Sequence, residues 1–363
     1  MAPKNQLSIL ASLSATLLFL QLMISTAAIS LSHSSFIGRI PRNTRRVHSN
    51  YRLLEDTMKP VAGDIKSVIR VAKDGTGDFS TVTDAVKSIP SGNTRSVVVW
   101  IGGGTYWEKI TIDRSKKFIT FYGDPENMPT IVFNGTAAQY GTLYSATVAV
   151  ESDYFMAVNI DFVNSAPMPD GKRKGAQAVA MRISGDMAAF YNCSFLGFQD
   201  TLCDDRGRHL FKDCYIRGTY DFIFGNGRSV YLNSILHSVA IGMGVVTAQA
   251  RESEEDESGF IFLHCKIKGR GDILLGRAWK SRSRVIFAHS DMASLVNPLG
   301  WSTGHHPERE KTVYYGEYKC SGRGAKTSGR VGFAKMLSDE EAKPFLGTTF
   351  IQGSQWILPP PKL

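Results

Sequence analysis

The chain has 363 residues, of which 43% are hydrophobic and 21% charged, and its formal net charge is +9. The apolar fraction is enough for a sizeable core and excludes a disordered polar chain. A basic balance suits nucleic acid, anionic lipid or an acidic polysaccharide as a partner. No zinc-finger, helix-turn-helix or RNP-type pattern occurs, so we expect no nucleic-acid partner.

Residues 1–28 have the pattern of a secretory signal peptide. Lys4 precedes a mostly apolar run from Leu7 to Ile24, and small residues follow it up to Ala28. A membrane anchor is the alternative reading, but Ser and Gln interrupt the run and no basic stop-transfer block follows it closely. We therefore expect cleavage near Ala28, an exported protein, and no membrane attachment afterwards.

The remaining chain divides into a short leader and one domain. Residues 29–66 are polar and Arg-rich without periodicity, which is typical of a linker or propeptide. Residues 67–363 contain no Pro/Ser-rich seam, so we treat them as a single domain. Its one clear helix is predicted over 79–90, where Ser80 or Thr81 can cap the start and Pro90 ends it.

A short strand-like phrase recurs along this domain. Each copy begins with a polar residue, continues with Cys, Ser or Ile, and then places an apolar residue after one spacer. The copies are NIDFVN (159–164), NCSFLG (192–197), DCYIRG (213–218), NSILHS (233–238), HCKIKG (264–269) and HSDMAS (289–294). Repeats of this length predict a solenoid, and alternation over β-branched and aromatic residues makes its unit a strand. Uneven spacing with a preserved phrase indicates an all-β fold, a parallel β-helix whose loops vary in length.

Two aspartates occupy the same place in consecutive copies. FYNCSFLGFQDTL (190–202) aligns with FKDCYIRGTYDFI (211–223) after a shift of 21 residues, which superimposes Asp200 on Asp221. Neighbouring coils lie roughly 4.8 Å apart, so the two carboxylates should be close. Such a pair separates into one protonated acid and one ionised nucleophile or base. An inert polar ladder on the solvent face is the alternative.

The residues around these aspartates resemble the plant pectin methylesterase (pectinesterase) family. The matching segments include GFQDTL (197–202), GTYDFIFGNG (218–227), LGRAW (275–279), AKDGTGDFSTVTDAV (72–86) and TVYYGEYKCSG (312–322). The resemblance covers nearly all of residues 68–340 and fits the class without an N-terminal inhibitor-like pro-domain. It implies a right-handed parallel β-helix with long loops beside a substrate cleft.

The resemblance also implies a function and a setting. Members hydrolyse the methyl esters of galacturonate units in homogalacturonan, which releases methanol and pectate during plant cell-wall modification. The expected protein is a secreted, monomeric carboxylic ester hydrolase of the apoplast, with pectin as its partner and no cofactor. A proteinaceous pectin methylesterase inhibitor is a further candidate partner.

Catalytic roles transfer by position in the matching segments. Asp221 is similar to the family's nucleophile, and Asp200 to the general acid that later acts as the base. Gln177 and Gln199 match the glutamines that stabilise the oxyanion, and Arg277 matches the residue that orients the nucleophile. Because a guanidinium is always charged, Arg277 would also keep Asp221 ionised.

Substrate binding is expected from three residues. Trp279 fits a stacking platform for a sugar ring, and Arg277 and Gln177 are expected to contact substrate as well. Three positions beside the cleft depart from the family's commoner residues: Tyr220 stands where Val is usual, and Cys203 and Leu274 where Tyr is usual. These departures bear on subsite preference and pH optimum.

Other functions are less well supported by the sequence. A pectate lyase or polygalacturonase shares the architecture but needs a calcium-binding carboxylate cluster or a carboxylate trio. A non-catalytic pectin-binding wall protein would have no reason to keep Asp200, Asp221 and Arg277. We expect no serine-esterase elbow, and the absence of HExxH and CxxC leads us to expect no metal site.

The sequence does not decide whether the cysteines form disulfides, and it contains two N-glycosylation sequons. Five cysteines in an exported chain leave at least one unpaired. Cys193 and Cys214 share a register, so they could form a disulfide or stack as inward thiols. Of the two sequons, Asn192 lies in a predicted strand, which leaves Asn134 as the glycosylation candidate.

Overall fold

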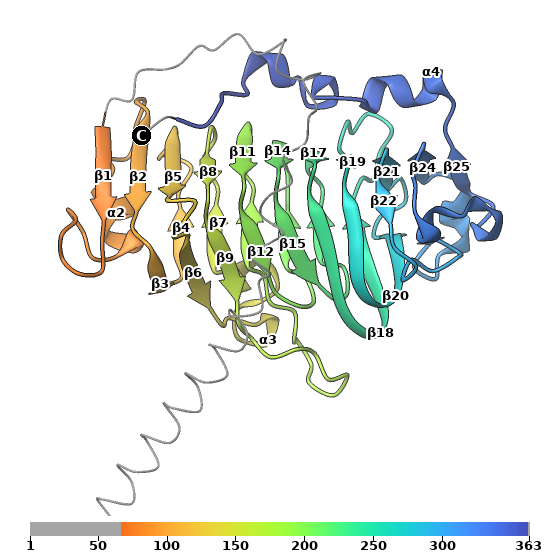
Figure 1. Cartoon of the computed structure of the whole chain (residues 1–363), viewed down its shortest axis with the longest axis horizontal. Helices are drawn as coiled ribbons and strands as arrows, with labels where there is room; N and C mark the ends of the chain where they lie inside the picture. Colours follow the sequence, from red (N-terminus) through yellow and green to blue (C-terminus); the bar gives the residue numbers. More distant parts are fainter. Residues whose placement is uncertain (1–66, 362–363) are drawn as a thin grey trace, which may run out of the picture. The chain divides into compact units, whose positions relative to one another are not determined.

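The computed structural model describes residues 67–361, and these wind into successive coils of short parallel strands (Figure 1). The predicted signal peptide (1–28) and linker (29–66) lie outside the described residues. Within residues 67–361, no helix is long and apolar enough to span a membrane.

The first sheet has eleven strands, all paired in parallel with their neighbours. In spatial order they are β1 (Ser67–Val71), β2 (Val97–Ile101), β5 (Ile119–Gly123), β8 (Met156–Val158), β11 (Ala188–Tyr191), β14 (Arg208–Lys212), β17 (Arg228–Leu232), β19 (Gly259–Leu263), β21 (Arg284–Ala288), β24 (Tyr314–Tyr318) and β25 (Ala334–Met336).

The other strands form two parallel ladders that we call the second and third sheets. The second sheet contains β3 (Gly104–Trp107), β6 (Pro129–Phe133), β9 (Asp161–Asn164), β12 (Ser194–Leu196) and β15 (Tyr215–Gly218). The third sheet contains β4 (Ile110–Ile112), β7 (Val148–Val150), β10 (Met181–Ile183), β13 (Leu202–Asp204) and β16 (Ile223–Gly225). Two long strands, β18 (Ile235–Gln249) and β20 (Lys266–Ala278), extend across both sheets, and β22 (Asp291–Met292) and β23 (Trp301–Ser302) pair with β20.

The helices in residues 67–361 are short. Thr81 caps α2 (Val82–Ser88) by accepting a hydrogen bond from the Asp84 amide, which confirms the predicted helix. The others are α3 (Ala137–Tyr140), α4 (Asp339–Ala342) and the 3₁₀ turns η3 (Leu143–Ser145), η4 (Pro307–Lys311), η5 (Arg323–Ala325), η6 (Thr327–Gly329), η7 (Lys343–Phe345), η8 (Thr349–Ile351) and η9 (Gly353–Gln355).

The recurring phrase marks the corner between the first and second sheets. Its first residue has a positive φ in every copy, a conformation that Asn, Asp and His tolerate better than other non-glycine residues. These corner residues are Asn159 (59°), Asn192 (49°), Asp213 (57°), Asn233 (53°), His264 (54°) and His289 (50°). Lys319 (47°) makes the same corner one coil later, so the repeat extends one copy further than the sequence phrase predicts.

The second residue of the phrase points into the core. Cys193, Cys214 and Cys265 are buried there, and Cys320 packs against the same core. All five cysteines are free thiols, so of the two arrangements left open for Cys193 and Cys214, stacked inward thiols are observed.

Stacked aromatic rings fill the core beneath the first sheet. The ring centroids of Phe190 and Phe211 are 4.8 Å apart, and those of Phe211 and Tyr231 are 4.5 Å apart. Phe262 and Phe287 continue the stack at 4.5 Å per step. These rings lie in register because their strands pair residue for residue. The predicted all-β parallel β-helix is confirmed.

Candidate active site

Asp200 and Asp221 lie at the corner between the second and third sheets. Asp200 stands between β12 and β13, and Asp221 stands at the equivalent point between β15 and β16. The Asp200 amide donates a hydrogen bond to the Tyr220 carbonyl (3.1 Å), so the two corners are adjacent. Both aspartates have positive φ values, 62° and 49°, and both are buried. The repeat therefore brings two carboxylates together, as predicted.

Arg277 reaches Asp221 from the long strand β20. Pairing along the third sheet aligns Cys203, Phe224, Ala248 and Arg277 on consecutive coils. The Arg277 Nε lies 2.8 Å from Asp221 Oδ1, and its Nη2 lies 2.5 Å from Oδ2. This bidentate geometry is the strongest form of an arginine–carboxylate pair.

The two carboxyl groups differ in their electrostatic surroundings. Burial raises the pKa of Asp200 well above its usual value, and the neighbouring Asp221 charge raises it further. Burial also raises the pKa of Asp221, but the two hydrogen bonds and the charge of Arg277 oppose that rise. Asp200 is thus suited to hold a proton, while Asp221 is suited to stay ionised.

Gln177 and Gln199 lie in the same row as Tyr220 on three consecutive coils. The Ala178 amide donates to the Gln199 carbonyl (3.2 Å), just as the Asp200 amide donates to Tyr220. Both glutamines are partly exposed, and in the described residues neither side-chain amide is engaged in a hydrogen bond. Their donors are therefore available to a ligand beside the two aspartates.

Aromatic rings flank Arg277 on two sides. Its guanidinium carbon lies 5.7 Å from the ring centroid of Trp279 and 5.7 Å from that of Tyr220. Trp279 stacks on Phe224 with centroids 5.8 Å apart, yet 38% of it is exposed, which suits a sugar platform better than a core residue. The sequence marks Tyr220 only as a departure from the family pattern, and the structure places its ring beside Arg277.

One stretch of the sequence has the spacing of a serine nucleophile elbow and needs to be examined in the structure. Residues 300–304, GWSTG, do fit the G-x-S-x-G pattern of a nucleophile elbow. In the structure Ser302 ends strand β23 in parallel register with Arg277, and its Oγ accepts a hydrogen bond from the Gly304 amide. Among the described residues no histidine is bonded to Ser302, so this stretch is not a catalytic elbow.

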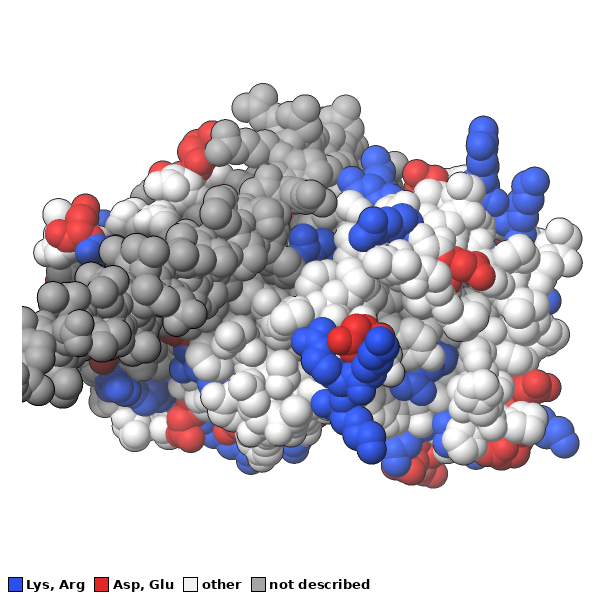
Figure 2. All heavy atoms as spheres, turned by 90° about the horizontal axis from the view of Figure 1, so that it is seen from below, with Lys and Arg blue, Asp and Glu red and all other residues white. Residues whose placement is uncertain are grey.

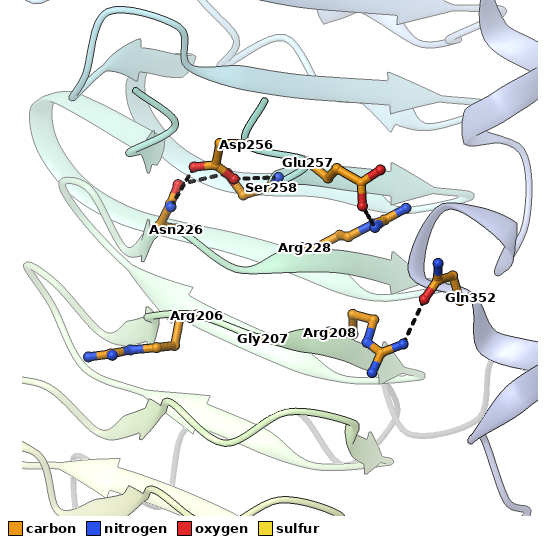
Figure 3. A pocket seen from close by; sticks show the side chains of 9 residues that line it. All are labelled: Arg206, Gly207, Arg208, Asn226, Arg228, Asp256, Glu257, Ser258 and Gln352. Carbon is orange, nitrogen blue, oxygen red and sulfur yellow. Dashed lines mark hydrogen bonds and ion pairs between the residues drawn. The ribbon is translucent and has the colours of Figure 1, made fainter. Parts of the chain in front are cut away.

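A hollow of about 550 Å³ lies away from the aspartates, at the corner between the third and first sheets (Figure 3). Its charged groups are engaged with one another. Arg208 donates to Gln352, Arg228 pairs with Glu257, and Asp256 accepts from Asn226. None of the predicted site residues lines it, and its contacts connect the C-terminal segment to the coils.

Two remaining predictions concern metal and glycan sites. Between residues 67 and 361 there is no group of three His, Cys, Asp or Glu side chains that could hold a metal ion. Asn134 is exposed, as a glycosylation site requires, whereas the Asn192 amide donates to Asn159 Oδ1 at 2.8 Å.

Comparison with known proteins identifies the family. The family model for pectinesterases matches residues 68–354. A relative from Arabidopsis thaliana is 58% identical over 292 residues, which cover 80% of this chain and 86% of the relative. The chain belongs to the pectinesterase family. Pectinesterases are carboxylic ester hydrolases, so the predicted enzyme class and pectin methylesterase function are confirmed, and nothing favours the chain-cleaving or non-catalytic alternatives.

Solved pectinesterase structures share the fold. Pectin methylesterase from carrot aligns with a TM-score of 0.75 at 34% identity, covering 80% of this chain and 94% of the carrot chain. A pectin methylesterase in complex with a hexasaccharide aligns with a TM-score of 0.68 at 25% identity, covering 81% and 98% of the two chains.

Proposed function

We propose that this pectinesterase hydrolyses the methyl esters of galacturonate units in homogalacturonan by covalent catalysis, with Asp221 as the nucleophile. The bidentate Arg277–Asp221 pair beside the buried Asp200 carries the proposal. An ionised carboxylate can attack an ester without a metal if the charge of the intermediate is stabilised.

The first half of the reaction forms an acyl-enzyme. An Asp221 oxygen attacks the ester carbonyl carbon, and the carbonyl oxygen becomes an oxyanion. The side-chain amides of Gln177 and Gln199 donate hydrogen bonds to it, and one such donor contributes about 3 kcal/mol at the barrier. Asp200 gives its proton to the departing methoxy oxygen, so methanol leaves and the galacturonyl group remains on Asp221.

The second half returns the enzyme to its starting state. Asp200, now ionised, takes a proton from water as that water attacks the acyl carbonyl. The bond to Asp221 breaks, which releases a galacturonic acid unit and restores the Asp221 carboxylate. Arg277 and Trp279 are proposed to position the sugar that carries the ester, with Trp279 offering its exposed ring face.

The proposed setting is the cell wall outside the cell. Plant pectinesterases are cell-wall enzymes, and a homologous enzyme is known in complex with a hexasaccharide. The formal charge of +9 suits an acidic polysaccharide partner, and Lys and Arg side chains group around an acidic one near the middle of the face in Figure 2. We propose secretion through residues 1–28, action as a monomer, and regulation by a proteinaceous inhibitor.

Product analysis tests the proposed reaction. The secreted protein would be incubated with highly methylated pectin while methanol, reducing ends and unsaturated chain ends are followed together. We expect methanol without new chain ends of either kind. New reducing or unsaturated ends would support a hydrolase or lyase, and folded protein that releases no methanol from pH 5 to 9 would contradict the esterase proposal.

A further inference from the structure

The guanidinium group of Arg277 has few hydrogen-bond partners besides the candidate nucleophile. Its Nε and Nη2 donate to the Asp221 carboxylate, and in the described part of the chain no backbone carbonyl accepts a hydrogen bond from it. The side chain of Arg277 is 26% exposed, whereas that of Asp221 is 3% exposed. Apart from the carboxylate itself, this arginine is therefore held by contacts other than hydrogen bonds.

A second bidentate pair in the domain is held differently. Arg330 donates to both oxygens of Glu317, at 2.7 and 3.0 Å, and both side chains are 3% exposed. Arg330 also donates to the carbonyls of Pro298 (3.0 Å) and Gly324 (2.7 Å). These carbonyls fix the guanidinium of Arg330 independently of its carboxylate. Between residues 67 and 361, Arg277 has no such acceptors, so its orientation needs another source.

Two aromatic rings take the place of those carbonyls at Arg277. The guanidinium carbon lies 5.7 Å from the ring centroid of Tyr220 and 5.7 Å from that of Trp279. An arginine within about 6 Å of a ring centroid is attracted by the negative face of the ring. Trp279 is itself supported by stacking on Phe224, with the two ring planes 12° apart.

Tyr220 is fixed by the same corner that carries the nucleophile. It stands directly before Asp221, and its carbonyl accepts a hydrogen bond from the Asp200 amide at 3.1 Å. Its side chain is partly buried, and within residues 67–361 its hydroxyl group takes part in no hydrogen bond. The ring, rather than the hydroxyl group, is thus what Tyr220 offers to Arg277. Valine, the residue that the family resemblance leads us to expect at this position, has no ring and could not make this contact.

We propose that Tyr220 is a positioning residue: its ring, together with that of Trp279, holds Arg277 in bidentate contact with Asp221. This inference rests on the proposed function, in which Asp221 must be ionised to attack the ester. Burial raises the pKa of Asp221, and the hydrogen bonds and charge of Arg277 oppose that rise. When the arginine swings away this opposition is lost, so the nucleophile takes up a proton at a higher pH.

The pH dependence of kcat on highly methylated pectin tests the inference. Tyr220→Val should move the acidic limb of the profile upward by about half a pH unit, the shift expected from loss of one partly exposed cation–π contact. Below that limb kcat should fall about threefold, while KM stays unchanged. Tyr220→Phe keeps the ring and should behave as wild type does.

Tyr314→Val is the matched control for Tyr220→Val. Tyr314 also lies beside a cation, with its ring centroid 5.3 Å from Lys335 Nζ, but it belongs to strand β24 of the first sheet. Its replacement should leave the acidic limb in place.

Two kinetic outcomes would overturn the inference. If Tyr220→Val raised KM and left the acidic limb in place, the ring would contact the sugar rather than position Arg277. If Tyr220→Phe moved the limb as far as Tyr220→Val does, the hydroxyl group would be responsible and the ring contact would not.

Nuclear magnetic resonance separates failure of this inference from failure of the esterase proposal, because it needs no turnover. A side-chain N–H group that is held in a hydrogen bond exchanges its proton with water slowly. We expect slow exchange of the Arg277 Nε–H signal in wild type and Tyr220→Phe, and about threefold faster exchange in Tyr220→Val. The signal would be assigned by its absence in Arg277→Lys. Equal exchange in wild type and Tyr220→Val would contradict the positioning role, whether or not methanol is released.

Discussion

At the scale of single residues, identical side chains acquire different chemistry from their neighbours. Asp200 and Asp221 occupy equivalent corners with similar φ values and similar burial. Only Asp221 is paired with Arg277, and the arginine comes from a strand that begins more than forty residues later. A repeated phrase can therefore predict where two carboxylates lie, but the partner that distinguishes them is set by coil pairing.

The raised pKa of Asp200 has a consequence for stability. A buried carboxyl group whose folded pKa exceeds its unfolded value binds more protons in the native state between those two values. Its contribution to stability is present at low pH and is lost as pH rises through the folded pKa. Asp200→Asn should therefore increase the free energy of unfolding relative to wild type, and the gain should grow with pH across that window.

Denaturant titrations at several pH values would measure this gain for Asp200→Asn. Asp113→Asn is the control, because hydrogen bonds from Ser115 lower the pKa of this exposed carboxyl and its removal should give no such gain. A variant Asp200→Asn that is less stable than wild type at neutral pH would contradict the electrostatic account.

Only part of the candidate site can be predicted from the sequence, and the reasons are physical. The 21-residue shift reveals Asp200 and Asp221 because a solenoid places equal positions side by side. The roles of Gln177, Arg277 and Trp279 follow from the family resemblance, since none of the three lies in a copy of the repeated phrase. The alignment of Arg277 with Cys203 and Phe224 cannot be predicted in this way, because only strand pairing along the third sheet reveals it.

At the scale of elements, the phrase predicts the short parallel strands, while the corner formed by its first residue is seen only in the structure. It could not predict that β18 and β20 run across two sheets, because each extends beyond the phrase through Gly-containing segments, 238–245 and 268–273, with no counterpart in shorter coils. The uneven spacing of the copies is explained by such extensions and by the long segment 165–180 between β9 and β10.

The stacked rings of the first sheet give a prediction about element stability. Phe211 is fully buried between Phe190 and Tyr231 in this stack. Phe211→Ala should lower the free energy of unfolding by about 3–5 kcal/mol, because it removes apolar contacts on both sides and leaves a cavity. The midpoint of a denaturant titration at constant slope would measure the loss.

An exposed apolar residue provides the comparison for Phe211→Ala. Leu299 is 54% exposed, so Leu299→Ala should change the free energy of unfolding by no more than about 0.5 kcal/mol. If Phe211→Ala cost no more than Leu299→Ala, the ring stack would not be a main source of stability.

At the scale of the whole domain, the C-terminal segment covers the outer face of the first sheet (Figure 1). Phe350, Ile351 and Trp356 pack in one cluster with outward residues of that sheet, including Leu210 and Ile261. The Tyr191 hydroxyl also donates to the Leu358 carbonyl at 2.7 Å. The catalytic corner lies between the other two sheets, so this segment serves the stability of the coils.

Removal of residues 348–363 should expose that apolar face. We expect a lower Tm and self-association, because contiguous apolar patches of this kind are rarely left uncovered on soluble proteins. Thermal unfolding and light scattering at several concentrations would measure both effects. A truncated protein with the Tm of the full chain and no association would show that the segment contributes little.

The most direct test of the central claim is the methanol-release rate of Asp221→Asn on highly methylated pectin. Near-ultraviolet circular dichroism would verify its fold. The account predicts a loss of at least about a thousandfold in kcat, because the amide cannot attack the ester, and a double variant with Asp200→Asn should be scarcely worse. A folded Asp221→Asn protein that keeps a tenth or more of the wild-type kcat would contradict Asp221 as the nucleophile.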